Sequence, residues 1–298
     1  MIPRFPTFKP ITLEDKPIID DYFRGNPPVI SELNFTNLFI WQEIHDFQIS
    51  QFEDSLLISA TFDNTPAFLQ PLVSSNYPKT IATCFDYLKA KTPTPSFRRA
   101  GEDFIEHAQL DKKAFTFVED RDNFDYIYSA KDLIELPSQK FHDKKNLIRQ
   151  FTKQHTYSYL RCCTDDHKKG FAFIDEWCTM KQCDIYEGLA KENRAVKKLL
   201  RNIDSLDAVG GAIELDGKVI ALAFGEFLNN DTFVVHIEKA RADMVGLYQT
   251  IHWEFLRNEA TRATFINREQ DVGVAGLRKA KLSYNPVRLL KKYTIVPK

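Results

Sequence analysis

The sequence lacks any apolar run close to the roughly 18 residues that a membrane-spanning helix needs. Its first residues also lack the apolar stretch of a signal peptide. Both absences argue against an integral membrane protein and against a secreted one. We expect a cytoplasmic protein without a transmembrane segment. Any contact with a membrane would then be peripheral.

Three signatures of nucleotide-binding proteins and hydrolases are missing as well. The sequence contains no GxxxxGK[ST] phosphate loop, no GxGxxG after a strand and no GxSxG elbow. These absences argue against P-loop NTPases, dinucleotide-binding enzymes and α/β-hydrolases.

The five cysteines form no CxxC pair. The spacing of Cys178 and Cys183 matches no metal-ligand pattern, even with His167 added. An odd count without a signal peptide favours reduced thiols that pack as small apolar side chains. We therefore expect no metal site.

Length and composition indicate two domains. At about 100–200 residues per domain, 298 residues suggest two, and 24 Phe against 3 Met predict rigid aromatic cores. Residues 1–139 hold 13 Lys and Arg against 21 Asp and Glu (−8), whereas residues 140–298 hold 27 against 20 (+7). A basic half is typical of contact with an anionic partner, although a solvated basic face explains the same numbers.

Short strands and helices follow the same order in both halves. In the second half, Asp216-Gly217 is a hairpin signal between Val209–Leu215 and Lys218–Leu228, and Phe233–Ala240 completes an antiparallel meander. The elements expected next are a helix, a strand, a helix and a strand, at 247–255, 263–268, 273–282 and 293–296. The first half ends similarly, with a strand at Phe124–Tyr128. This order predicts an α+β fold with mixed, mostly antiparallel sheets, of which the GNAT acyltransferase fold is one of several options.

The segment His236-Ile-Glu-Lys-Ala240 places charged side chains inside a predicted central strand. Strand alternation puts His236 and Glu238 on one face and Lys239 on the other. A charge inside a sheet is costly unless it is paired or used. Glu238 is therefore a candidate base for an attacking amine or hydroxyl, and a structural ion pair is the equally weighted alternative.

The polar run Asn267-Arg268-Glu269 abruptly ends an apolar strand. Ligands of open sheets bind beyond strand ends, and the N-terminus of a following helix attracts anions. We therefore predict that these three residues bind substrate, and that the nearby Asp271 caps the helix.

Arg278 and Lys281 lie three residues apart on one face of the last predicted helix, close to Tyr284. The two cations are candidates for phosphate binding, and the tyrosine is a candidate proton donor. Solvated basic residues and a packing tyrosine are the alternative.

A basic amphipathic helix is predicted between the halves, at 140–154. Its candidates for RNA or anionic membrane contact include His142, Lys144 and Lys145. An ordinary surface helix is the alternative.

A conventional coenzyme A site is not expected. GNAT enzymes hold the pyrophosphate of acetyl-CoA with a glycine-rich loop between the last meander strand and its helix. The corresponding segment, Arg241–Gly246, has a single glycine. No other cofactor is indicated.

Five motifs together resemble a bacterial family of unknown function that is named for its similarity to the C-terminal domain of phosphatidylglycerol lysyltransferase. The motifs are Phe141-His-x-Lys-Lys-Asn146, His236-Ile-Glu-Lys-Ala240, Gly246-x-Tyr-Gln249, Asn267-Arg-Glu-x-Asp-x-Gly273 and Gly276-Leu-Arg-Lys-Ala-Lys-x-Ser-Tyr284. The resemblance covers nearly the whole chain. It implies two tandem GNAT-like domains, which we place at residues 1–137 and 138–298.

The resemblance also implies a chemistry. Fem-type peptidyltransferases and the lysyltransferases move an aminoacyl group from a charged tRNA to a peptidoglycan precursor or a lipid. We therefore expect an aminoacyl-tRNA-like donor, with tRNA as a partner, and a small-molecule or peptide acceptor with an amine or hydroxyl. Glu238 is the expected base and Tyr284 a candidate acid.

The remaining candidates form the substrate and phosphate contacts. The expected substrate-binding residues are His236, Lys239, Tyr248, Gln249, Asn267, Arg268 and Glu269. A non-catalytic module that binds a small ligand or peptide is the second hypothesis, and an acetyl-CoA-dependent acetyltransferase is the third.

Overall fold

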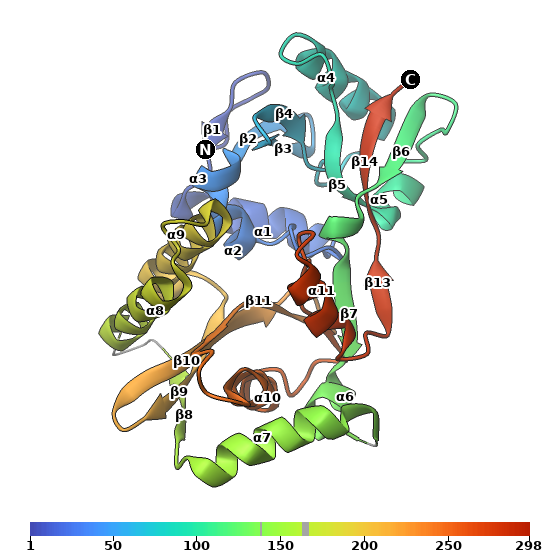
Figure 1. The fold of residues 1–298 in the computed structure, drawn as a ribbon. Coiled ribbons are helices and arrows are strands. Elements are labelled where there is room, and N and C mark those ends of the chain that lie inside the picture. Colours follow the sequence, from blue (N-terminus) through green and yellow to red (C-terminus); the bar gives the residue numbers. More distant parts are fainter. Residues whose placement is uncertain (138, 163–166) are drawn as a thin grey trace. The chain divides into compact units, whose positions relative to one another are not determined.

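Two mixed β-sheets organise the chain in the computed structural model, which describes residues 1–137, 139–162 and 167–298 (Figure 1). The first unit comprises Met1–Asp125, Gln270–Ala275 and Leu289–Lys298. The second unit comprises Tyr126–Glu269 and Gly276–Arg288. Within the described residues, each unit is built on a seven-stranded sheet.

The sheet of the first unit is mostly antiparallel. Its spatial order is β1 (Lys9–Pro10), β2 (Gln48–Phe52), β3 (Ser55–Phe62), β4 (Thr65–Phe68), β5 (Phe97–Gly101), β14 (Lys292–Pro297) and β6 (Phe115–Glu119). Strands β2, β3 and β4 form the meander, and β4 pairs in parallel with β5. The helices are η1 (Leu13–Asp15), α1 (Lys16–Gly25), α2 (Phe35–Ile40), α3 (Gln42–His45), α4 (Tyr77–Lys89), α5 (Glu102–His107) and η2 (Arg121–Asn123).

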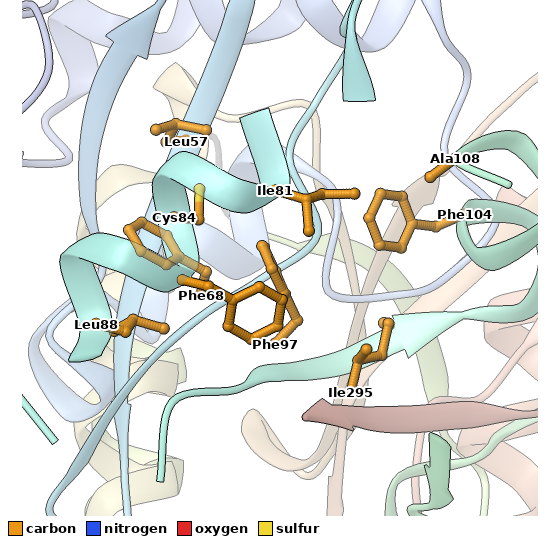
Figure 2. Packing of buried hydrophobic residues seen from close by; sticks show 11 residues of the cluster. Leu57, Phe68, Ile81, Cys84, Leu88, Phe97, Phe104, Ala108 and Ile295 are labelled. Carbon is orange, nitrogen blue, oxygen red and sulfur yellow. The ribbon is translucent and has the colours of Figure 1, made fainter. Parts of the chain in front are cut away.

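Helix α4 shows how the sequence builds the first core. The side chain of Asn76 caps its N-terminus by accepting from the backbone N–H of Lys79 at 3.1 Å. The apolar positions at i, i+3, i+4 and i+7 then face inward, as predicted. They are Ile81, Cys84, Phe85 and Leu88, all buried. Figure 2 shows Ile295 of the C-terminal strand β14 in the same cluster, so the last strand of the chain completes the core of the first unit.

The second unit has the corresponding sheet. Its spatial order is β13 (Arg288–Leu290), β7 (Asp125–Ser129), β12 (Phe265–Asn267), β11 (Thr232–Ala240), β10 (Lys218–Phe227), β9 (Val209–Leu215) and β8 (Ser158–Cys162). The helices are α6 (Ala130–Glu135), η3 (Gln139–Phe141), α7 (His142–Gln154), α8 (His167–Lys181), α9 (Glu187–Asn202), η4 (Ile203–Ser205), α10 (Leu247–Glu259) and α11 (Ala275–Leu282).

The central strands of the second sheet are covered on both faces. The predicted hairpin turn between β9 and β10 is present, with positive φ at Asp216 and Gly217. Helix α10 packs on one face of β9, β10 and β11, and α8 packs on the other face of β10 and β11 (Figure 1). This arrangement explains why β10 is apolar at successive positions.

Strands β11 and β12 separate after a short parallel pairing. They pair over Thr232↔Phe265, Phe233↔Ile266 and Val234↔Asn267. Beyond this point β11 continues to Ala240, whereas the backbone N–H of Arg268 donates to Tyr126 O at 3.0 Å, on the side of β7. The charged residues of β11 therefore lie where the two strands part.

The compact units differ from a contiguous division between residues 137 and 138. The strand expected at Phe124–Tyr128 is β7, which pairs with β12 in the second sheet. The strand expected at Tyr293–Val296 is β14, which pairs with β5 and β6 in the first sheet. Each sheet thus takes one strand from the other half of the sequence, because alternation identifies a strand but does not specify its partner.

The cysteine prediction is wrong for one pair. Cys178 and Cys183 form a disulfide, with Cα atoms 5.1 Å apart. The chain reverses at Gln182, which has a positive φ, and this turn brings the two thiols together. Cys84 is a buried free cysteine, as expected. Cys163 lies outside the described residues.

Within the described ranges, no helix is long and apolar enough to cross a membrane.

Candidate active site

Alternation along β11 separates two groups of charged side chains, as the sequence predicts. His236 and Glu238 point to the face covered by α10, where Glu238 contacts His252 of that helix. Lys239 points to the opposite face, and its Nζ lies 2.5 Å from Glu192 Oε2 and 4.0 Å from the centre of the Trp177 ring. Lys239 therefore belongs to a separate ion pair rather than to the Glu238 cluster.

Glu238 is held by two donors. Nη2 of Arg268 donates to its Oε2 at 2.6 Å, and Nδ1 of His252 donates to its Oε1 at 2.5 Å. Burial opposes ionisation of this carboxyl, but the guanidinium of Arg268 and then His252 outweigh it and lower the pKa to about 2. A carboxylate with so low a pKa is a weak proton acceptor at neutral pH, which argues against the predicted role of Glu238 as the base.

His236 bridges two other carboxylates. Its Nε2 lies 3.0 Å from Glu226 Oε1, and its Nδ1 lies 2.8 Å from Glu269 Oε1. Burial disfavours the charged ring, but the hydrogen bonds to both carboxylates raise its pKa to about 9. Both nitrogens therefore carry protons at neutral pH, and the imidazolium connects β11 to the segment after β12.

Two polar atoms beside Glu238 have no hydrogen-bond partner among the described residues. They are Nη1 of Arg268 and Nε2 of His252, and both are buried. A native protein seldom leaves such atoms unpaired, because each costs about 1–3 kcal/mol. A free donor and a free ring nitrogen beside one carboxylate are therefore candidates for contact with a substrate.

Tyr284 packs over this pair of residues. Its ring centre lies 4.8 Å from the guanidinium carbon of Arg268 and 5.2 Å from the His252 ring centre. Nζ of Lys144 lies 4.4 Å from the same ring and donates to Ser283 Oγ at 2.7 Å. Burial raises the pKa of Tyr284 to about 12 although Arg268 opposes the shift. The phenol is therefore protonated at neutral pH, as a proton donor must be.

Two further predicted residues position the backbone. Lys281 is buried, and its Nζ donates to the carbonyl of Arg268 at 2.5 Å, so this cation holds the segment after β12 rather than facing solvent. The side-chain oxygen of the buried Asn267 accepts from the backbone N–H of Glu269 at 2.8 Å, where φ is positive. Both contacts hold the backbone of the segment that carries Arg268 and Glu269.

The structure leaves several predicted residues apart from the cluster. The Tyr248 hydroxyl accepts from Trp177 Nε1 at 3.3 Å. Lys239 also contacts the Trp177 ring, so Tyr248 belongs with Lys239 rather than with the Glu238 cluster. The other residues lie half-buried or exposed on three helices: Gln249 on α10, His142 and Lys145 on α7, and Arg278 on α11. Asp271 accepts from the backbone N–H of Gly273 at 3.0 Å in a turn before α11, and it also pairs with Arg121.

Sequence reasoning missed His252 and Glu226. Both are buried polar residues in elements whose neighbouring positions are apolar, α10 and β10. The available signal for His252 was its position on the apolar side of a predicted helix, beside Ile251 and three residues before Phe255. Its partner on β11 is 14 residues away in sequence, and only the packing of α10 on the sheet identifies it.

Comparisons with known proteins agree with this architecture. The family model described as phosphatidylglycerol lysyltransferase, C-terminal, matches residues 25–296. A crystal structure of a conserved protein of unknown function from Bacteroides thetaiotaomicron is 32% identical, covers 100% of both chains and has a TM-score of 0.91. No curated protein matches the sequence.

More distant solved structures share the fold. The C-terminal domain of a putative lysylphosphatidylglycerol synthetase from Agrobacterium fabrum has a TM-score of 0.68 at 10% identity, covering 95% of this chain and 91% of that one. FemX has a TM-score of 0.61 at 9% identity, with 97% and 96% covered. The predicted fold class, a mixed α/β chain with two tandem GNAT-like, mostly antiparallel sheets, is confirmed. The chain belongs to the family of the C-terminal domain of phosphatidylglycerol lysyltransferase.

Proposed function

We propose that this protein transfers an aminoacyl group from an aminoacyl-tRNA-like donor to an amine or hydroxyl acceptor. Family and fold point to an acyltransferase-like domain of the lysyl or aminoacyl transfer type. The reaction would take place in the cytoplasm, where charged tRNA is available. The donor and the acceptor are the parts of this proposal that experiment must identify.

The buried, unpartnered Nη1 of Arg268 carries the proposal. In acyl transfer, negative charge develops on the carbonyl oxygen of the donor ester, and a fixed donor in a water-poor site stabilises it strongly. Arg268 is fixed because Glu238 binds its Nη2, Tyr284 packs on its guanidinium and Lys281 binds its carbonyl. It also lies where β11 and β12 part, which is the place where the acyl donor enters in GNAT-type folds.

Surface charge supports an anionic donor. The second unit holds 25 Lys and Arg against 21 Asp and Glu, a net +4, whereas the first unit holds 15 against 20, a net −5. Among the predicted phosphate contacts of the second unit, His142 is exposed, and Lys145 and Arg278 are half-buried. We propose that these three residues meet tRNA phosphates, together with Lys144 near the cluster.

Two measurements test the donor. Binding of bulk tRNA should weaken steeply as salt rises, because each neutralised phosphate releases counterions. The protein should also move label from a pool of tRNA charged with radioactive amino acids to an acceptor in a tRNA-free cell extract. Salt-independent binding, or label that stays on tRNA with every amino acid, would contradict the proposed donor.

A further inference from the structure

The second unit contains two buried histidines in the candidate site, and they differ in how many ring nitrogens are bound. His236 uses both nitrogens, on Glu226 and Glu269. His252 uses Nδ1 alone, on Glu238, and its Nε2 has no partner among the described residues. His252 is only 2% exposed, so water does not compensate the free nitrogen at the surface. The difference marks His252 as the ring that is open to a further contact.

The protonation state of His252 follows from its neighbours. A carboxylate accepts hydrogen bonds, so the 2.5 Å contact with Glu238 requires the proton on Nδ1. The other charged or titratable groups around the ring are Arg268 after β12, Lys144 on α7 and Tyr284 after α11. Burial, followed by Arg268 and Lys144, lowers the pKa of His252 although Glu238 opposes the shift. The ring is therefore neutral at pH 7, with the lone pair on Nε2.

We propose that His252 is the proton acceptor of the transfer reaction, an inference that rests on the proposed function. The amine or hydroxyl of the acceptor attacks the ester carbonyl carbon of the donor, and its proton moves to Nε2 of His252. The carbonyl oxygen, negatively charged at this stage, accepts a hydrogen bond from Nη1 of Arg268. The bond from that carbon to the ribose oxygen then breaks, and the ribose oxygen takes the proton from the imidazolium.

In this scheme Glu238 is a positioning residue. It holds the proton of His252 on Nδ1, which leaves Nε2 as the acceptor, and it stabilises the imidazolium after proton transfer. The same carboxylate holds Arg268, so the free acceptor and the free donor are oriented by one side chain. Both atoms would accelerate acyl transfer: one receives the proton of the nucleophile, and the other stabilises the oxyanion.

The variant His252→Asn separates proton acceptance from packing. The asparagine amide can still donate to Glu238 from the position of Nδ1, but it offers no base. We expect the single-turnover transfer rate to fall by about 10²–10⁴-fold, the usual contribution of a positioned general base. The acid limb of the pH–rate profile should disappear, while tRNA binding and the melting temperature stay close to those of the wild type. His107→Gln, at an exposed position of the first unit, is the matched control and should leave the transfer rate and the pH–rate profile unchanged.

Nuclear magnetic resonance of the full chain with ¹⁵N-labelled histidine gives a readout that does not need the substrate. The His252 signals, assigned by their absence from His252→Asn, should show a protonated Nδ1 and an unprotonated Nε2 at pH 7. An imidazolium at pH 7, or a proton on Nε2, would overturn the inference. A wild-type protein that transfers label and a His252→Asn variant within tenfold of it would overturn the inference and leave the proposed function intact. A wild-type protein that transfers nothing removes the proposed function, and the tautomer then decides whether Nε2 is available as an acceptor.

Discussion

Arg268, in the segment after β12, and Glu238, on β11, form an ion pair of 2.6 Å between Nη2 and Oε2 where the two strands have already separated. Their side chains are 14% and 13% exposed. The pair lies where β11 and β12 part, and it holds the guanidinium whose Nη1 has no hydrogen-bond partner among the described residues. Under the proposed function, this ion pair would stabilise the second unit and also orient Arg268.

Replacing Glu238 with Gln should lower both stability and activity. The change keeps the shape of the side chain but leaves Arg268 without its counter-charge, which typically costs about 3–5 kcal/mol for a buried pair. Urea unfolding measures this loss. Glu187→Gln, which disrupts an exposed pair with Lys191 on α9, is the control and should cost at most about 1 kcal/mol. Equal stability of the two variants would mean that the Glu238–Arg268 pair contributes no more than a surface contact.

Stability should fall on the alkaline side because of His236. Its pKa is raised from 6.5 to about 9, so the folded state holds the proton more tightly than the unfolded state. This contribution is complete below about pH 6.5 and is lost as pH rises to about 9, a change of about 3 kcal/mol in the free energy of unfolding. Urea midpoints between pH 6 and pH 9.5 measure it. If the urea midpoint of His236→Gln falls with pH as steeply as that of the wild type, the loss of stability at alkaline pH comes from other groups.

Two adjacent lysines of the first unit, Lys291 and Lys292, should contribute very different amounts to the free energy of unfolding. Nζ of the fully buried Lys292 lies 2.5 Å from Glu32 Oε2 and 2.6 Å from Asp125 Oδ1. Lys292→Met removes the cation that two buried carboxylates share and should cost about 3–5 kcal/mol. Lys291 pairs with Glu119 at the surface, so Lys291→Met should cost between about 0 and 1 kcal/mol. Thermal unfolding of both variants checks this, and similar losses would show that the buried cluster is not a main source of stability.

Acetyl-CoA should not bind at micromolar concentrations. Gly246, the N-cap of α10, has a φ of 85°, and a Cβ there would lie 2.1 Å from the carbonyl oxygen of Leu147 on α7. The helix end that receives a pyrophosphate in acetyl-CoA enzymes is thus packed against a backbone carbonyl, which repels anions. Isothermal titration calorimetry checks this, and saturable one-to-one binding in the micromolar range would restore the acetyltransferase hypothesis.

The sequence predicts local structure well because local signals determine it. The Asp216-Gly217 turn, the apolar stripe of α4 and the alternation of His236, Glu238 and Lys239 all follow from residue spacing. The exchange of β7 and β14 between the sheets does not, because strand partners are set by contacts between residues far apart in sequence.

The candidate site shows the same limit. Residue type and position made three residues candidates: Glu238 as a charge inside a strand, Arg268 as a polar residue at a strand end, and Tyr284 as a phenol after the basic last helix. The role of Glu238 depends on the two donors that bind it, and no sequence pattern reveals those donors. His252 escaped prediction for the same reason, because its free nitrogen is a property of packing.

The most direct test of the central claim is aminoacyl transfer by an Arg268→Gln variant. Arg268→Gln and the surface control Arg257→Gln, whose arginine is 45% exposed on α10, are compared with the wild type in single-turnover transfer from charged tRNA. We predict that Arg268→Gln loses about 10²–10³-fold in rate, as expected for removal of one oxyanion donor, with tRNA affinity within twofold. Arg257→Gln should retain the wild-type rate. A folded Arg268→Gln protein that transfers the label at the wild-type rate would contradict the account.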